Sequence, residues 1–182
     1  IFNVSTATNN VFQVLDSTLG LPEDLAPVTT DKRIPFYMSI NETVAPRWRI
    51  KGFGAALDTP WPIYVPGEIT LIKAECNARK SSPSIPDAIV ELDNILTKAP
   101  ADDPFGIGAD LDPYTGAATA DAVLTEIYRQ RCIELYMQGY KLEDMRRFGR
   151  SNDPNVEKRR NFFPYPFRER DNNPNTPADP AF

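Results

Sequence analysis

The chain contains no histidine among its 182 residues. This absence removes both the commonest general base and the commonest metal ligand of proteins. Only two cysteines are present, Cys76 and Cys132, too few for a disulfide framework in a chain of this length. Each lies in a segment with helical spacing, so we expect two free cysteines that pack as small apolar side chains.

The chain also lacks a basic excess, long apolar runs and recognisable catalytic motifs. Its formal net charge is −5 at pH 7, which disfavours nucleic-acid binding because that needs a basic surface. No apolar run approaches the roughly 18 residues of a membrane span. There is no Gly-rich phosphate loop, no nucleophile motif and no identifiable pair of facing carboxylates. We therefore expect a protein that is not an enzyme.

Proline is abundant, and it divides the chain into regions. The 18 prolines amount to about twice the average usage, so long stretches should be loop or extended chain. Residues 1–66 show no sustained helical period, and two segments, 33–40 and 47–53, are strand-like and rich in aromatics. Residues 150–182 predict an irregular tail, partly anchored by the aromatic side chains of Phe162, Phe163, Tyr165 and Phe167.

Helical spacing begins after Pro66. Residues 67–79 carry two apolar stripes, and a second helix runs from Pro86 to before Pro100, so the two predict an antiparallel hairpin. A third helix, the longest, begins after a cap at Thr119 or Asp121. We expect Gly139 to bend or interrupt it and Gly149 to end it. The fold class is therefore mainly α, with short strands and extensive loops.

The third helix carries charge where a simple amphipathic helix would carry leucine. Leu124, Tyr128, Arg131 and Leu135 share one face. A charge within an apolar stripe is costly unless it is paired. We predict a structural charge network, with Glu68 and Glu75 as further candidate partners, made of Arg131, Glu134, Asp144, Arg146 and Arg147. The alternative is an anion site built from Arg131, Arg146 and Arg147.

An acidic loop precedes the third helix. It carries Asp102, Asp103, Asp110 and Asp112, which invites a calcium interpretation. Counted from Asp102, however, Ile107 and Pro113 stand where an EF-hand needs Gly and Glu. We favour a solvated acidic loop and no cofactor, with a looser calcium site at these four aspartates as the alternative.

Three segments, in order, resemble the C-terminal region of the SusD/RagB family of surface nutrient-binding lipoproteins of Bacteroidetes. Residues 67–75, Gly-Glu-Ile-Thr-Leu-Ile-Lys-Ala-Glu, resemble a family helix that ends in Ala-Glu. Residues 129–149 resemble its Glu-Arg-rich helix, and residues 163–175 resemble its terminal Pro-aromatic-Pro signature. Residues 51–53, Lys-Gly-Phe, fit the segment that precedes the first helix. The departures at Gln130, Gln138, Lys141 and Met145 soften the charge pattern.

The resemblance implies a non-enzymatic binding protein. Members of the family are lipid-anchored at the outer-membrane surface, cap a TonB-dependent transporter of the SusC type, and pass glycans or, in some members, peptides into it. Their fold joins tetratricopeptide-like helix pairs to a loop-rich half that carries the ligand. This chain would be the C-terminal part, with the anchor outside it: residues 1–66 the ligand side, 67–149 the helical scaffold and 150–182 the tail.

Aromatic side chains in the Pro-rich region are the candidate ligand contacts. Sugars offer apolar C–H faces to stack on rings, and hydroxyls to hydrogen-bond. The candidates are Phe36, Tyr37, Trp48 and Trp61, with Arg47 and Arg49 as donors. The alternative for each ring is packing beneath a loop. For the whole chain, the alternatives are an intracellular helical-repeat scaffold for protein partners, or a peptide-binding member of the same family.

Overall fold

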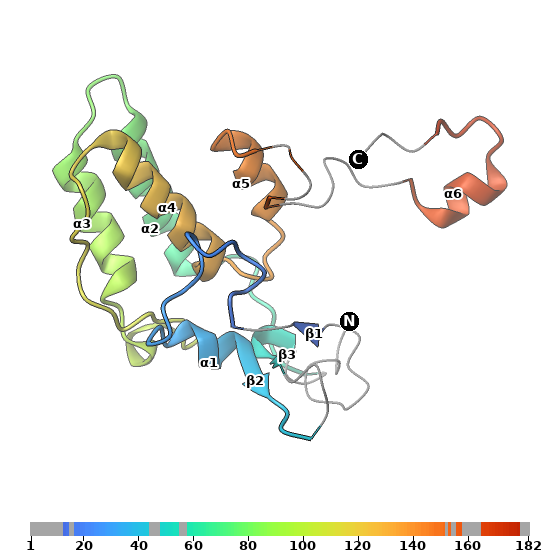
Figure 1. Cartoon of the computed structure of the whole chain (residues 1–182), viewed down its shortest axis with the longest axis horizontal. Coiled ribbons are helices and arrows are strands. Elements are labelled where there is room, and N and C mark those ends of the chain that lie inside the picture. The colour runs from blue at the N-terminus through green and yellow to red at the C-terminus, as the bar shows by residue number, and fades with distance from the viewer. Residues whose placement is uncertain are drawn as a thin grey trace. The chain divides into compact units, whose positions relative to one another are not determined.

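The computed structural model describes residues 13–14, 17–43, 48–54, 58–151, 153, 156–157 and 165–178. This part of the chain is mainly helical, as predicted, with six α-helices, one small antiparallel sheet and long connecting loops (Figure 1). The chain divides into two compact units, residues 1–144 and 145–182. The short helix α5 (Lys141–Arg147) crosses the division.

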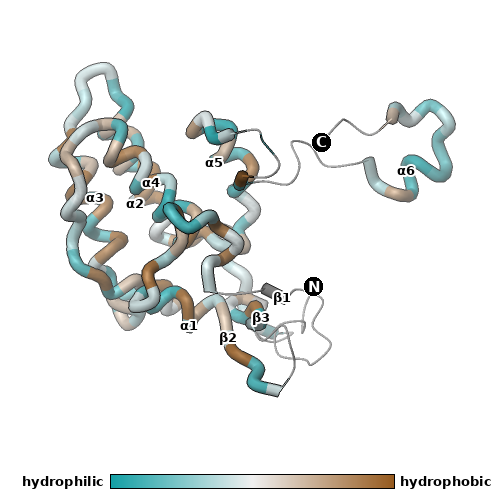
Figure 2. The backbone as a smooth tube through the Cα atoms, in the orientation of Figure 1, coloured by the Kyte–Doolittle hydropathy of each residue, from teal (hydrophilic) through white to brown (hydrophobic). Residues whose placement is uncertain are grey.

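Three helices form the core of the first unit. α2 (Pro66–Arg79) and α3 (Ile85–Leu96) make the predicted hairpin, and α4 (Ala120–Glu134) packs against both (Figure 1). Each helix mixes hydrophobic and hydrophilic positions, as Figure 2 shows. The buried positions recur at helical spacing: Leu71, Ala74 and Ala78; Ala88, Leu92 and Ile95; Val123 and Ile127. Burial of these faces supplies the main driving force for folding.

The helix ends follow the signals in the sequence. The Thr119 hydroxyl accepts a hydrogen bond from the Ala122 N–H at 3.4 Å, which confirms the predicted cap of α4. The predicted third helix is interrupted rather than bent. α4 ends at Glu134, and Gly139 (φ +86°) lies in the turn before α5 begins. Gly149 (φ +62°) donates its N–H to the Arg146 carbonyl, as expected of a glycine that ends a helix.

The sheet has the strand order β1-β3-β2. β3 (Trp48–Ile50) lies between β1 (Gln13–Val14) and β2 (Met38–Ile40), antiparallel to both. A strand over residues 47–53 is therefore confirmed only in its middle, because a 3₁₀ turn (Gly52–Gly54) follows.

The strand predicted over residues 33–40 is wrong for its first five residues. They form the short helix α1 (Arg33–Tyr37), and only Met38–Ile40 are extended. Pro35 is tolerated because the N–H groups of a first helical turn need no partner within the helix. Arg33, Ile34 and Tyr37 are buried while Pro35 is exposed. This is helical spacing, because in a strand Pro35 would share the buried face of Arg33 and Tyr37.

The described part of the second unit contains α6 (Phe167–Asn172), where the sequence predicted only irregular chain. α6 is mostly hydrophilic (Figure 2). Phe167 is 68% exposed, so the prediction that it anchors the tail is wrong. Tyr165 is 39% exposed, and Phe162 and Phe163 lie outside the described residues.

Both cysteines are free, as expected, but only Cys132 is buried; Cys76 is exposed, so its expected burial is wrong. Within the described ranges, no helix combines the length and the hydropathy that crossing a membrane requires.

Candidate functional site

A cluster of buried charges joins the C-terminal end of α4 to α1 and to the loop after α3. We call it the central ion-pair network; its members are Asp31, Arg33, Lys98, Asp103 and Glu134. Glu134 lies at its centre, with one carboxylate oxygen 2.6 Å from Lys98 Nζ and the other 3.1 Å from Arg33. Arg33 also binds both oxygens of Asp31, at 2.7 and 3.0 Å. Lys98 completes the chain to Asp103 at 2.8 Å.

Neutral groups complete the hydrogen bonding of the network. The Gln130 side-chain oxygen accepts from Arg33 at 2.6 Å, and the Tyr37 hydroxyl donates to the Glu134 carbonyl at 2.7 Å. Burial alone would lower the pKa of Arg33, but its bond to Asp31 and the charge of Glu134 raise the pKa above its ordinary value. Burial, reinforced by Glu134, also raises the pKa of Tyr37 well above its ordinary value.

The central ion-pair network is a brace rather than a ligand site. Arg33 and Glu134 have no accessible side-chain surface, so no ligand reaches them in this conformation. Gly67, at the start of α2, packs directly on the Glu134 carboxylate, where a Cβ would collide with it. α1, α2, α4 and the loop after α3 therefore meet at a single side chain.

The charged residues predicted to form one network pair with different partners. Arg131 binds both oxygens of Asp144 at 2.8 and 3.0 Å, and this buried pair ties α4 to the start of α5. Glu134 bonds Arg33 and Lys98 instead. Arg146 and Arg147 are exposed.

The two further candidate partners, Glu68 and Glu75, each interact with another side chain of the protein. Glu68 forms a hydrogen bond with Tyr140. The negative charge of Glu68, followed by burial, raises the pKa of the Tyr140 hydroxyl above its ordinary value. Glu75 pairs with Arg79 one turn along α2. The anion-site alternative is not favoured, because its central member, Arg131, already holds a buried carboxylate.

The acidic loop is organised by one of its four aspartates. Asp103 is buried, accepts the N–H groups of Phe105 at 2.9 Å and Ile107 at 3.2 Å, and pairs with Lys98. The other three, Asp102, Asp110 and Asp112, are exposed. Among the residues described, no three acidic or cysteine side chains converge as a metal site would require. Asp103 is thus committed to the fold rather than to the calcium alternative.

Three aromatic side chains from separate segments pack around Phe53. We call Phe36, Phe53, Trp61 and Phe105 the aromatic cluster. The buried Phe53 ring lies 5.5 Å from Phe36, 5.8 Å from Trp61 and 5.9 Å from Phe105, measured between ring centroids. Trp61 is 40% and Phe105 36% exposed, and Phe36 is half-buried. The cluster therefore combines a rigid centre with a rim that solvent reaches.

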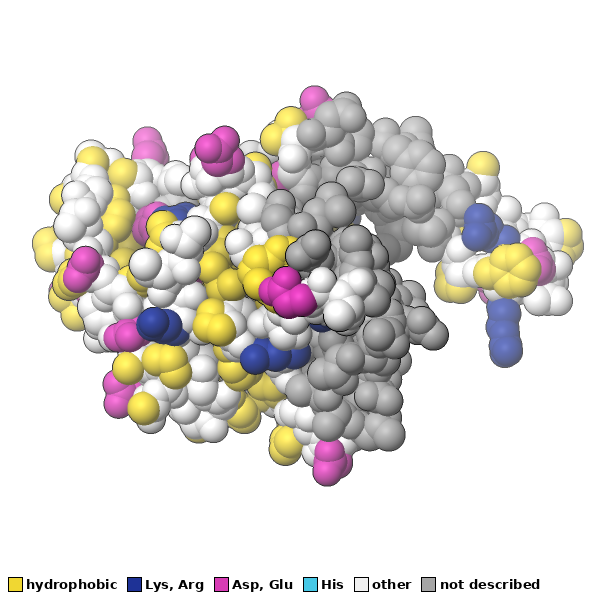
Figure 3. All heavy atoms as spheres, turned by 60° about the horizontal axis from the view of Figure 1, so that its bottom comes forward, with side chains coloured by type: hydrophobic (Ala, Val, Ile, Leu, Met, Phe, Trp, Pro, Cys, Tyr) yellow, Lys and Arg dark blue, Asp and Glu magenta, His cyan; other side chains and the backbone are white. Residues whose placement is uncertain are grey.

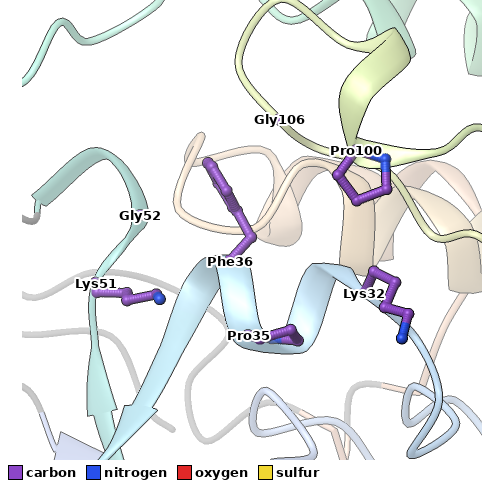
Figure 4. Close-up of a pocket in the computed structure, with 7 residues that line it drawn as sticks. All are labelled: Lys32, Pro35, Phe36, Lys51, Gly52, Pro100 and Gly106. Carbon is purple, nitrogen blue, oxygen red and sulfur yellow. The ribbon is translucent and has the colours of Figure 1, made fainter.

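A pocket of about 460 Å³ opens beside the Phe36 side of this cluster (Figure 4). We call it the lysine pocket; it is lined by Lys32, Pro35, Phe36, Lys51, Gly52, Pro100 and Gly106. In Figure 4 the Phe36 ring rises from α1, with Lys51 extending toward it from one side and Pro100 on the other. The lining of the pocket thus combines an aromatic ring, two prolines and two lysines.

A second pocket, of about 360 Å³, lies beside Phe105. It is lined by Pro62, Ile63, Tyr64, Pro66, Pro104 and Phe105. Ile63 is 94% and Tyr64 60% exposed. Figure 3 shows hydrophobic groups on the surface of the described chain, with cationic groups among them. The accessible rim of the aromatic cluster therefore continues into an apolar surface.

The six predicted ligand contacts have different positions. Phe36 and Trp61 lie in the aromatic cluster. Tyr37 and Arg49 are buried, so neither presents its side chain to a ligand in this conformation. Trp48 is half-buried in the central strand of the sheet, opposite Ile40. Arg47 lies outside the described residues.

Sequence reasoning missed the residues that pack with Phe36 and Trp61 in the aromatic cluster. Phe53 and Phe105 are 52 positions apart, and no local periodicity relates them. Lys32 carried no pattern of its own, and Lys51 entered only through the Lys-Gly-Phe segment of the resemblance, because a single lysine in a loop is usually a solvated charge. Arg33 was missed as a network member because its segment was assigned to a strand.

Comparison of the chain with protein-family models, curated proteins and solved structures finds no match. The resemblance to the SusD/RagB family therefore rests on the three sequence segments described above.

Proposed function

We propose that this chain is the C-terminal part of a SusD-like, lipid-anchored protein of the bacterial outer-membrane surface. It binds a glycan and delivers it to a SusC-type TonB-dependent transporter, and it is not an enzyme. The observation that carries the proposal is the aromatic cluster, in which Phe36 lines an open pocket and Trp61, which also contacts Phe53, is 40% exposed.

The geometry suits a sugar because sugars bind aromatic rings through apolar C–H faces while their hydroxyls remain hydrogen-bonded. Phe53 holds Phe36 and Trp61 in place from beneath, so little ordering cost arises when a ligand stacks on them. Below them, Tyr37 contacts Phe36 and donates to Glu134, which links the aromatic cluster to the central ion-pair network. The binding surface thus has a rigid support.

Affinity electrophoresis in native gels that contain soluble polysaccharides tests the proposal. We expect at least one polysaccharide to retard the chain, and Trp61→Ala to reduce that retardation. The matched control is Phe167→Ala, which removes an exposed aromatic ring from α6, outside the aromatic cluster. Equal retardation of the wild type and Trp61→Ala, or no retardation by any polysaccharide, would contradict a stacking role.

A protein-binding scaffold is the second candidate, and one observation favours it. Ile63, Tyr64, Ile69 and Ile72 are all exposed around the start of α2, and exposed apolar groups of this kind are typical of protein-contact surfaces. A peptide ligand for the aromatic cluster belongs to the same alternative. Mass spectrometry of the native protein separates the two candidates: a lipidated N-terminal cysteine supports the surface glycan binder, and an unlipidated cytoplasmic protein overturns it.

A further inference from the structure

We infer that the lysine pocket takes an acidic glycan, one whose sugar rings carry carboxylate or sulfate groups. The inference deepens the proposed function, on which it rests, by naming the class of glycan. It follows from the two lysines that line the pocket and from the apolar groups between them.

The two lysines of the pocket have no ionic partner among the described residues. Neither Lys32 nor Lys51 lies within 4.0 Å of a described carboxylate, and no Asp or Glu lines the pocket. Lys98, by contrast, binds two carboxylates in the central ion-pair network. An anion at the pocket would therefore meet positive charge that the fold itself leaves unneutralised.

The space beside the lysines is apolar, which selects the body of the ligand. Pro35, Phe36 and Pro100 contribute a ring face and two proline rings to the lining. A small inorganic anion would leave these groups without contact. A sugar ring covers them with its C–H face and places a carboxylate or sulfate substituent at its edge, within reach of an amine.

Backbone hydrogen bonds fix the main chain at both lysines. The Lys51 N–H donates to the Tyr37 carbonyl at 2.8 Å, and the Lys32 N–H donates to the Ala109 carbonyl at 3.0 Å. Gly52 adopts φ +65° and lies against the Phe36 and Tyr37 rings, where a Cβ would come within 3.4 Å of both. Only a glycine fits this turn without strain, and the turn directs the Lys51 side chain toward Phe36 (Figure 4).

The net negative charge of the chain opposes the binding of an acidic ligand. A net charge of −5 repels a polyanion at long range. Attraction to an acidic polysaccharide therefore requires a local cationic site, and it should weaken as added salt screens that site.

Affinity electrophoresis with three polymers tests the inference: polygalacturonate, dextran sulfate and neutral dextran. The first carries carboxylates, and the other two share a backbone but differ in sulfate. We expect polygalacturonate or dextran sulfate to retard the chain more strongly than neutral dextran. Lys32→Gln and Lys51→Gln should each weaken that binding roughly threefold, and the double variant about tenfold, as for exposed ion pairs. Lys80→Gln, at the C-terminal cap of α2 and outside the lining of the pocket, is the charge-matched control.

Each outcome decides the inference. Retardation by an acidic polymer that falls in the pocket variants, but not in Lys80→Gln, supports it, and the polymer that retards most tells carboxylate from sulfate. Retardation by neutral dextran or another neutral polysaccharide alone overturns the acidic class and leaves the proposed function standing. Acidic retardation unchanged in the double variant overturns the pocket. No retardation by any polysaccharide overturns both proposals.

Discussion

The two sides of α1 use charge in opposite ways. On the inner side, Arg33 is completely buried and bonds Asp31, Glu134 and Gln130. On the outer side, Lys32 and Pro35 are exposed and line an open pocket with Phe36. One five-residue helix thus belongs to both the central ion-pair network and the lysine pocket.

The contrast separates charges that hold the fold together from charges available to a ligand. A buried cation must be paired, because its desolvation costs several kcal/mol. An exposed lysine bears no such cost and can remain without a partner until a ligand arrives. Substitutions on the inner side should therefore change stability, and those on the outer side should change binding.

The largest expected effect follows the removal of the central carboxylate charge. Glu134→Gln leaves Arg33 and Lys98 facing a neutral amide, and we expect a loss of about 3–5 kcal/mol in the free energy of unfolding. Urea denaturation followed by circular dichroism measures it. Glu91→Gln is the control, since Glu91 meets the largely exposed Lys73 at 3.8 Å and should cost under about 1 kcal/mol. Equal losses in the two variants would show that the central ion-pair network does not brace the fold.

A smaller loss should follow from filling the contact between α2 and the same carboxylate. Gly67→Ala places a Cβ against Glu134, so the side chain must shift and its bonds to Lys98 and Arg33 distort. Overpacking of this kind costs about 1–3 kcal/mol, although alanine is the better helix former. Thr70→Ala, in the same helix, should be close to neutral. A stabilised Gly67→Ala would show that Glu134 has room to move.

Tyr37 should make stability depend on alkaline pH. Its pKa is raised above the ordinary value of 10.0, so its contribution is complete below about pH 10 and is lost as pH rises toward the raised value. Tyr37→Phe removes the bond to the Glu134 carbonyl, at a cost of about 1 kcal/mol at neutral pH, and should flatten the alkaline decline. Urea denaturation as a function of pH measures both; a decline equally steep in the variant would contradict the assignment.

The smallest change in stability is expected on the outer side. The double variant Lys32→Gln, Lys51→Gln removes two cations that bind no described carboxylate, so the free energy of unfolding should change by under about 0.5 kcal/mol. The same urea titration measures it. A loss near that of Glu134→Gln would place these lysines in the structural framework.

Sequence reasoning found the parts of this fold that depend on local signals. The spacing of apolar residues predicted α2 and α3, Thr119 indicated the start of α4, and Gly139 indicated an interruption before α5. It also foresaw that charge on the third helix would be paired within the protein, as Arg131 is with Asp144.

Contacts between distant segments could not be predicted from one sequence. Arg33 and Glu134 are 101 positions apart, and nothing local indicates their pairing. α1 is too short for its period to show, and its Pro35 suggested a break in structure. The aromatic cluster combines rings from four segments, so its two sequence-predicted members, Phe36 and Trp61, were found without the Phe53 that joins them.

The most direct test of the contrast is a thermal unfolding experiment with and without oligogalacturonate. A ligand that binds only the folded state raises Tm. We predict that oligogalacturonate raises the Tm of the wild type, that Glu134→Gln has a lower Tm but keeps the ligand-induced rise, and that the double lysine variant keeps its Tm but loses the rise. If Glu134→Gln loses the rise while remaining as stable as the wild type, or if the double lysine variant retains the full rise, the separation of brace and binding site is contradicted.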